Sequence, residues 1–191
     1  MNTEELNSLK ERAYKTAVAH GFHEEEKPDA YWLGLVMSEA GEAINADRKG
    51  LHGDAVLFND DLAKMSFKDS FEAHIKDSVE DELADVVIRL LDFAGLKGYE
   101  LSTDEYLDSF IISALEELKT SGLPGLLLFF IYALFYNSRF HDLEKCVCRI
   151  IRIISGCFDK MTGGSDCDLW WFVKQKMRYN EQRPMLNGKR Y

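Results

Sequence analysis

Apolar residues recur at helical spacing along almost the whole chain of 191 residues, and no stretch alternates convincingly between apolar and polar positions. Spacings of three and four residues are typical of the buried face of a helix, whereas residues of a half-buried strand alternate at every second position. Only three prolines, Pro28, Pro124 and Pro184, interrupt this pattern. The sequence therefore predicts an all-α protein, and its length suits one helical domain over residues 1–191.

Polar residues and glycines mark the expected ends of the helices. We expect helices over about 4–20, 29–48, 77–94, 103–120, 123–138, 142–160 and 169–180. The residues between the second and third helices predict a long connection with room for one short helix, and SGLPG separates the fourth helix from the fifth. We divide the domain into the helices of a candidate catalytic site at 1–100, extra helices at 101–167, and a last helix with a basic tail at 168–191.

The chain carries a formal net charge of -10 at pH 7. An acidic surface repels polyanions, so we expect no nucleic-acid partner. The N-terminus is too polar for a signal peptide, and the apolar run Leu123–Tyr136 is shorter than the roughly 20 residues that span a membrane. The four cysteines lack the spacing of a zinc site and suit a reducing compartment. We therefore expect a cytoplasmic protein with no membrane partner.

Four polar residues share one narrow stripe of the helix expected at 77–94: Glu82, Asp85, Arg89 and Asp92. Apolar side chains cover most of the remaining circumference of this helix, among them Val79, Leu83, Val86, Val87, Leu90, Leu91, Phe93 and Ala94. The polar face of a surface helix is normally wider than this stripe. The pattern therefore predicts carboxylates in partly buried surroundings.

The helix expected at 29–48 carries a similar pair, Glu39 and Glu42, beside apolar and small residues. Both this pair and Glu82 with Asp85 have a spacing of three residues, which places both carboxylates of each pair on one side of a helix. If the two helices are antiparallel with these sides facing, the four carboxylates converge and repel one another unless cations neutralise them. Oxygen ligands favour Mg²⁺ or Mn²⁺. The alternative is a set of surface charges, with Asp85 and Arg89 forming an ion pair along one helix.

Three segments resemble the MazG-like nucleotide pyrophosphohydrolases, which belong to the all-α NTP pyrophosphatases and are related to dimeric dUTPases. The segments are GFHEEEKPDAYWLGLVMSEAGEAINADRKG, DELADVVIRLLDFA and KMRYNEQRPMLNGKRY, and the resemblance covers about 12–50, 71–101 and 169–191. It implies a helical bundle in which an ExxE pair and an ExxD pair bind Mg²⁺, with Mn²⁺ as the alternative. It also implies hydrolysis of a nucleoside triphosphate, in our interpretation a dNTP, to the monophosphate and pyrophosphate.

The resemblance assigns the catalytic and metal-binding roles to Glu39, Glu42, Glu82 and Asp85. In such a site the ion bridges phosphate oxygens and lowers the pKa of a bound water. Either Glu39 or Glu42 then takes the proton of that water as it attacks the α-phosphorus.

Basic residues cluster at the C-terminal end of this otherwise acidic chain. The resemblance implies that the residues contacting phosphate or sugar are Lys176, Asn180, Arg183 and Lys189. The alternative is a tail that only improves solubility. Phe22 and Trp32 are candidates for a wall that stacks on the base, although aromatic residues at such positions are more often part of the core. We interpret His20 and His23 as surface or capping residues.

The residues at 102–167 lie outside the resemblance, yet they can be aligned with the first half of the chain. When Arg152 is aligned with Arg89, the helix order matches while other residues replace every carboxylate of the site. One hypothesis is an internal pseudo-dimer with a degenerate second half, and the alternative is an unrelated helical insertion. We expect a homodimer unless the internal repeat takes its place.

A catalytically inactive helical interaction module is the alternative to an enzyme. Retention of all four acidic positions and of the basic tail argues against this alternative. A di-iron helical bundle would need Glu-x-x-His pairs, which the sequence lacks.

Overall fold

The computed structural model of the chain describes residues 1–103, 108–140 and 142–185, with the side chains at 108–111, 115, 129, 131–133 and 135–140 excepted. The helices are α1 (Thr3–Ala19), α2 (Asp29–Lys49), α3 (Ala55–Asp61), α4 (Phe67–His74), α5 (Val79–Lys97), α6 (Asp108–Phe140), α7 (Leu143–Met161) and α8 (Leu169–Asn180). The described residues contain no strand, which confirms the predicted all-α class.

Local capping explains where the two helices of the predicted carboxylates begin and end. Gly50 ends α2 in the left-handed conformation, with φ of 63°. Ser78 begins α5 by accepting a hydrogen bond from the backbone of Asp81, and Gly98 ends it with φ of 69°. Gly95 directly follows the helix predicted at 77–94 and was expected to help end it, but α5 continues to Lys97. A Cβ at Gly95 would lie 2.5 Å from Tyr14 of α1. A glycine at this position therefore permits close helix packing.

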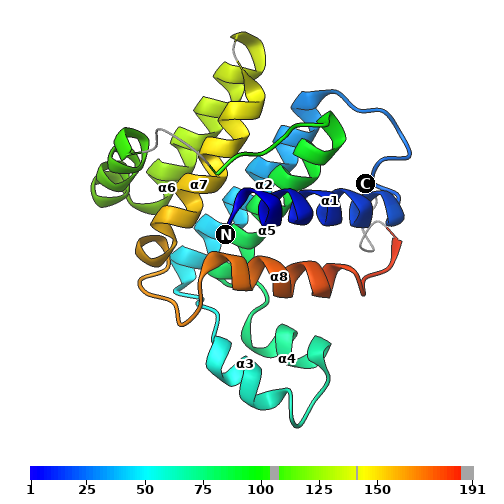
Figure 1. Cartoon of the computed structure of the whole chain (residues 1–191). Coiled ribbons are helices and arrows are strands. Elements are labelled where there is room, and N and C mark those ends of the chain that lie inside the picture. The colour runs from blue at the N-terminus through cyan, green and yellow to red at the C-terminus, as the bar shows by residue number, and fades with distance from the viewer. Residues whose placement is uncertain (104–107, 141, 186–191) are drawn as a thin grey trace.

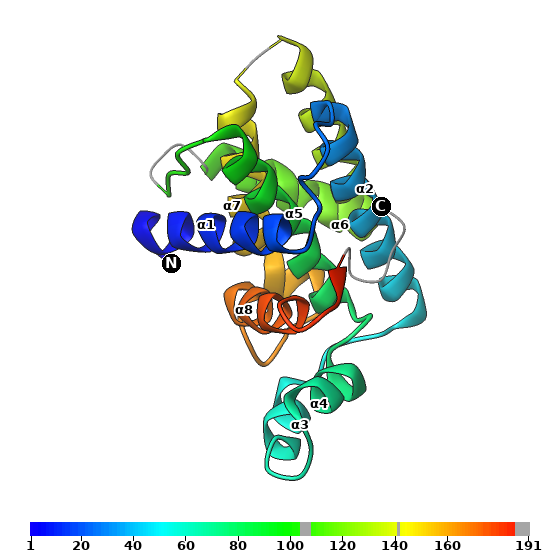
Figure 2. The ribbon, with the colours of Figure 1, turned by 90° about the vertical axis from the view of Figure 1, so that its right-hand side faces the viewer.

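The expected connection after α2 contains two short helices rather than one, and α3 and α4 project together from the rest of the molecule (Figure 1, Figure 2). The predicted break in SGLPG is present at Gly122, which leaves the helical conformation with φ of 64° and ψ of -167° inside α6. The expected start of that helix near residue 103 adjoins residues 104–107, which lie outside the described residues.

Helix α5 lies at the centre of the bundle, in contact with α1, α2, α7 and α8 (Figure 1). Helices α1 and α8 run side by side across it, joined by an ion pair of 2.7 Å between Arg12 and Glu181. Helices α6 and α7 pack against each other, α6 also against α2 and α7 against α5. This pairing does not distinguish a degenerate repeat from an insertion, so the internal pseudo-dimer stays a hypothesis.

Most residues of α5 are buried, and four carboxylates are buried with them. The carboxylate of Glu80 has a structural role: it accepts hydrogen bonds from the backbone of Gly53 at 2.8 Å and from His52 at 3.2 Å. The other three, Asp81, Glu82 and Asp92, belong to the site described below. Within the described part of the chain, no helix is both long and apolar enough to cross a membrane.

Candidate functional site

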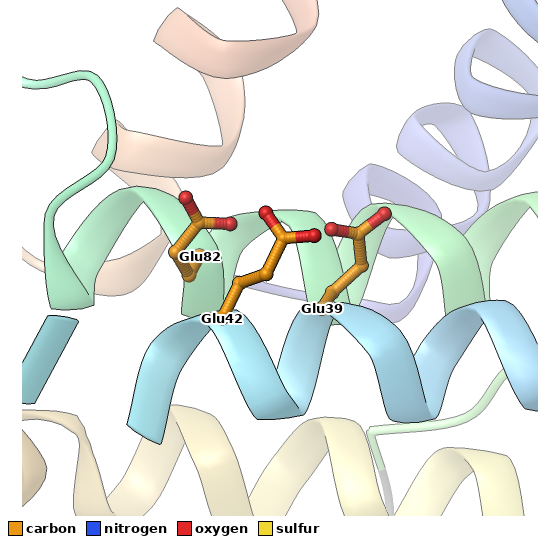
Figure 3. A group of neighbouring side chains, drawn as sticks. All are labelled: Glu39, Glu42 and Glu82. Carbon is orange, nitrogen blue, oxygen red and sulfur yellow. The ribbon is translucent and has the colours of Figure 1, made fainter. Parts of the chain in front are cut away.

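Three of the four predicted carboxylates come together between α2 and α5. Glu39, Glu42 and Glu82 each offer one oxygen, and these oxygens lie within 4.8 Å of one another (Figure 3). Glu39 and Glu82 are each only 5% exposed, whereas Glu42 is open to solvent. Glu39 lies across from Arg89 and Glu42 across from Glu82, so the two helices are antiparallel. We call these three residues the carboxylate triad.

Burial and mutual repulsion make the carboxylate triad costly to ionise. Burial raises the pKa of Glu82 to about 8, and the charges of Asp81, Asp85 and Glu42 add to this effect while Lys176 opposes it. Burial likewise raises the pKa of Glu39 above its ordinary value, and the charge of Asp85 raises it further. A cation bound between these oxygens would relieve both effects.

The fourth predicted carboxylate, Asp85, is paired with α8 instead. Its oxygens lie 2.9 Å from Nζ of Lys176 and 3.5 Å from Nδ2 of Asn180. Lys176 is itself buried and also lies 2.6 Å from Asp81. Burial alone would lower the pKa of Lys176, but the charges of Asp85 and Asp81 raise it well above its ordinary value. The ammonium group predicted to contact phosphate is therefore already paired inside the protein.

A second acidic group lies next to the triad and shares Glu82 with it. Asp77, Asp81 and Glu82 have carboxylate oxygens within 4.8 Å of one another. Burial raises the pKa of Asp81 to about 6, although the charge of Lys176 lowers it. Because Lys176 already supplies a positive charge to this group, the carboxylate triad is the better candidate for a metal ion.

Arg89 connects α5 to the triad. Its Nε donates a hydrogen bond of 3.0 Å to Oε1 of Glu39, and its Cζ lies 5.6 Å from the ring centroid of Phe22. Arg89 therefore hydrogen-bonds to Glu39 and not to Asp85, its alternative partner on the same helix. The guanidinium instead crosses from α5 to α2.

A pocket adjoins the triad and is partly open to solvent, with about 640 Å³ of empty space when the open solvent at its mouth is included. Its walls come from α1, α2, α5 and α8 and from the segments that follow α1 and α8. The lining residues are Ala13, Thr16, Ala17, His20, Phe22, Glu39, Asp85, Ile88, Arg89, Asp92, Met177, Asn180 and Arg183. Because Glu39 belongs both to the triad and to this lining, a ligand in the pocket would lie next to the three carboxylates.

The predicted ligand-contacting residues are divided between the pocket and other places. Phe22, Asn180 and Arg183 line the pocket. Trp32 does not line it: the residue is 4% exposed, belongs to the core, and packs against the tilted ring of His23 with ring centroids 4.6 Å apart. Lys189 lies outside the described residues.

The two histidines near the end of α1 have different roles. His20 is the C-cap residue of α1, and its ring bonds to the backbone oxygens of Thr16 and Arg183. His23 is not a surface residue, because its side chain is only 7% exposed and lies 2.7 Å from the carboxylate of Asp92. Burial raises the pKa of Asp92 above its ordinary value, although the hydrogen bond from His23 opposes the shift.

The carboxylate triad fits a small divalent cation. Adjacent ligands of an octahedral Mg²⁺ ion lie about 3 Å apart and opposite ones about 4.2 Å, so three oxygens within 4.8 Å of one another would move closer together by side-chain rotation to bind one ion. Carboxylate oxygens are also the ligands that Mg²⁺ and Mn²⁺ prefer.

Two residues of the site were not singled out by the sequence analysis as functional candidates. Arg89 and Asp92 both line the pocket, and both belong to the narrow polar stripe that drew attention to this helix. The stripe was therefore the signal that could have identified them. Comparison of the chain with family models, with curated proteins and with solved structures found no match.

Proposed function

We propose that this protein is a divalent-metal-dependent nucleoside triphosphate pyrophosphohydrolase of the MazG-like kind, with a dNTP as substrate. The observation that carries the proposal is the carboxylate triad at the edge of a partly open pocket. Arg89, Asn180 and Arg183 line the same pocket and offer hydrogen-bond donors to phosphate.

The carboxylates of the triad would have different roles in the hydrolysis. The carboxylate triad would hold a Mg²⁺ ion, which would neutralise phosphate charge and lower the pKa of a nearby water. The water oxygen would form a bond to the α-phosphorus, its proton would pass to a carboxylate, and the bond from the α-phosphorus to the bridging oxygen would break and release pyrophosphate. Glu42 suits the role of general base, because it is exposed and forms no hydrogen bond among the described residues. Glu39 suits it less, because Arg89 already holds one of its oxygens.

Phe22 and Asn180 would orient the nucleotide. The ring of Phe22 lines the pocket and can stack on a base, as aromatic side chains do in many nucleotide sites. Asn180 reaches both the pocket and Asp85, so its amide can hold a phosphate or sugar oxygen close to the triad.

Pyrophosphate release from a panel of dNTPs and NTPs, with Mg²⁺ and then with EDTA, tests the proposal. We expect release from at least one nucleotide that EDTA abolishes, and a fall of about 10²-fold or more in kcat for Glu42→Gln. Glu116→Gln removes an exposed carboxylate of α6 that pairs with Lys119, and should leave the rate unchanged. No release from any nucleotide would instead favour an inactive helical interaction module.

The expected homodimer is a separate proposal. The mass of the protein in solution, measured by light scattering after gel filtration, tests it. A dimer would support association of two copies, whereas a monomer that hydrolyses nucleotides would favour a site complete within one chain.

A further inference from the structure

We infer that Arg89 is a phosphate-binding residue that Glu39 holds in the metal-free protein and that a divalent cation on the carboxylate triad releases. The inference deepens the proposed function and rests on it. It assigns to Arg89 a ligand class, the phosphate groups of a nucleotide, and it makes cation binding and phosphate binding depend on one shared carboxylate, that of Glu39.

The first line of support is how little of the hydrogen-bonding capacity of Arg89 is used. A guanidinium group has five N–H donors. Among the described residues, only the Nε donor has a protein partner, Oε1 of Glu39 at 3.0 Å. The side chain nevertheless lines the pocket and is only 19% exposed. Arg89 thus brings unused donors to a partly enclosed space, where an anionic ligand would be their natural partner.

The second line of support is that Arg89 and a divalent ion on the triad would compete for the carboxylate of Glu39. Its carboxylate neutralises Arg89 in this structure, and the same residue supplies one oxygen of the carboxylate triad. A divalent ion on the triad would withdraw negative charge from Glu39 and repel the guanidinium. The largely buried Arg89 would then keep the charges of Asp85 and Asp92 near it but no hydrogen-bonded anion, and a phosphate would supply that partner.

The third line of support is the position of Arg89 on α5. It lies one turn beyond Asp85 along the stripe of α5 that faces the pocket, and Asp92 follows it. Glu39 and Arg89 line the same pocket, so a ligand with one phosphate at the triad and the rest in the pocket would lie near Arg89. The ring of Phe22 lies 5.6 Å from Cζ of Arg89, within the range of a cation–π contact, and the planar guanidinium suits a bidentate contact with phosphate.

The substitution Arg89→Gln should change the affinities for Mn²⁺ and for nucleotide in opposite directions. Mn²⁺ binding without nucleotide, followed by electron paramagnetic resonance, should become at least about threefold tighter, because Glu39 no longer serves Arg89. Binding of a non-hydrolysable α,β-imido dNTP in the presence of Mn²⁺, followed by calorimetry, should weaken by about tenfold to hundredfold. A residue with a merely structural role would not tighten the binding of the cation.

Two further variants make the test specific. Arg89→Lys keeps the charge but loses the planar fork, so Mn²⁺ binding should stay near that of the wild type while nucleotide binding weakens. Arg178→Gln is the matched control, because its guanidinium stacks on Phe67, 4.0 Å from the ring centroid, and does not line the pocket. It should change neither measurement. Circular dichroism and urea unfolding confirm that each variant is folded. If Arg89→Gln is unfolded, nucleotide binding by Arg89→Lys that is as tight as in the wild type refutes the phosphate contact.

Each outcome has a distinct meaning. If the wild type binds Mn²⁺ but Arg89→Gln leaves both affinities unchanged or weakens both, the proposed exchange of Arg89 from Glu39 to phosphate is refuted, whereas the metal site is not. If the wild type binds no Mn²⁺ at millimolar concentration, the carboxylate triad is no metal site and the proposed function fails as well. Tighter cation binding together with weaker nucleotide binding supports the exchange.

Discussion

The substitution Glu82→Gln should stabilise this protein by an amount that grows with pH. The pKa of Glu82 is raised from an ordinary value of 4.5 to about 8, chiefly by burial. Between these two values the folded protein binds more protons than the unfolded chain, so the free energy of unfolding falls as the pH rises. At 1.36 kcal/mol per pKa unit, the raised pKa of Glu82 lowers the free energy of unfolding by about 1 kcal/mol at pH 5, about 3 at pH 7 and about 5 at pH 9, because folding must first protonate the carboxylate and, above pH 8, bury its charge.

Glutamine has nearly the shape of glutamate but no charge, so the variant should escape this cost. Urea unfolding in EDTA, at about pH 5, 7 and 9, measures the difference between the two proteins. We expect the variant to be more stable by about 1, 3 and 5 kcal/mol at the three pH values. At neutral pH the thermal midpoint should rise by about 6–12 °C, since 1 kcal/mol shifts a chain of this length by about 2–4 °C.

Glu116→Gln is again the control, because it removes an exposed carboxylate and should follow the wild-type pH profile. Equal pH profiles for Glu82→Gln and the wild type would refute the raised pKa, and so would a variant less stable than the wild type at about pH 9. Glu82→Gln should also lose pyrophosphate release, because it removes a ligand of the proposed metal.

Three other perturbations give separate tests. Lys176→Met should lower the free energy of unfolding by about 3–5 kcal/mol, because it leaves buried carboxylates without a partner, and Asp81→Asn in addition should restore part of the loss. Gly95→Ala should lower the free energy of unfolding by about 1–3 kcal/mol, because its Cβ would lie 2.5 Å from Tyr14. Gly34→Ala should raise it by up to about 1 kcal/mol, because nothing lies within 4 Å of the added Cβ. Urea unfolding measures all four variants. Mg²⁺ at about a hundred times its Kd should raise the stability of the wild type by about 2.7 kcal/mol in thermal unfolding, and EDTA should reverse the effect.

The sequence predicted best those helix ends that local residues decide. The predicted start of α2 at Asp29 agrees with the structure, and so do both ends of α8, Leu169 and Asn180. Gly95 was misinterpreted because its role depends on Tyr14, which is close in space but far away in the sequence. A glycine that ends a helix and a glycine that allows close packing look alike when only neighbours along the chain are considered.

The short helices α3 and α4 show a second limit. Each has too few turns for hydrophobic periodicity to emerge, so the sequence predicted room for only one helix there. Their arrangement depends on Phe58 and Phe71, whose ring centroids lie 6.5 Å apart, and such pairing between elements leaves no local pattern.

The candidate site shows the same division. The spacing of carboxylates within α2 and within α5 left convergence and a set of surface charges both open, and the apolar setting and the family resemblance favoured convergence; the structure brings Glu39, Glu42 and Glu82 together. The partner of Asp85 could not be predicted, because Lys176 comes from α8 and only the packed fold brings the two together. For the same reason the sequence suggested a partner for Arg89 on its own helix, whereas the hydrogen bond is to α2.

The balance of charge around the triad explains why a cation suits this site better than a neutral ligand. The acidic side chains that meet here are Glu39, Glu42, Asp81, Glu82 and Asp85, and the basic ones are Arg89 and Lys176. Asp77 also lies near Glu82, but Lys76 balances its charge. Five carboxylates against two cations leave three negative charges when all are ionised, and protonation of Glu82 still leaves two. A divalent ion of opposite charge offsets the remainder, and the fold alone does not. Loss of a carboxylate should therefore strengthen the metal-free fold while it weakens cation binding, and loss of Lys176 should weaken the metal-free fold and increase its dependence on the cation.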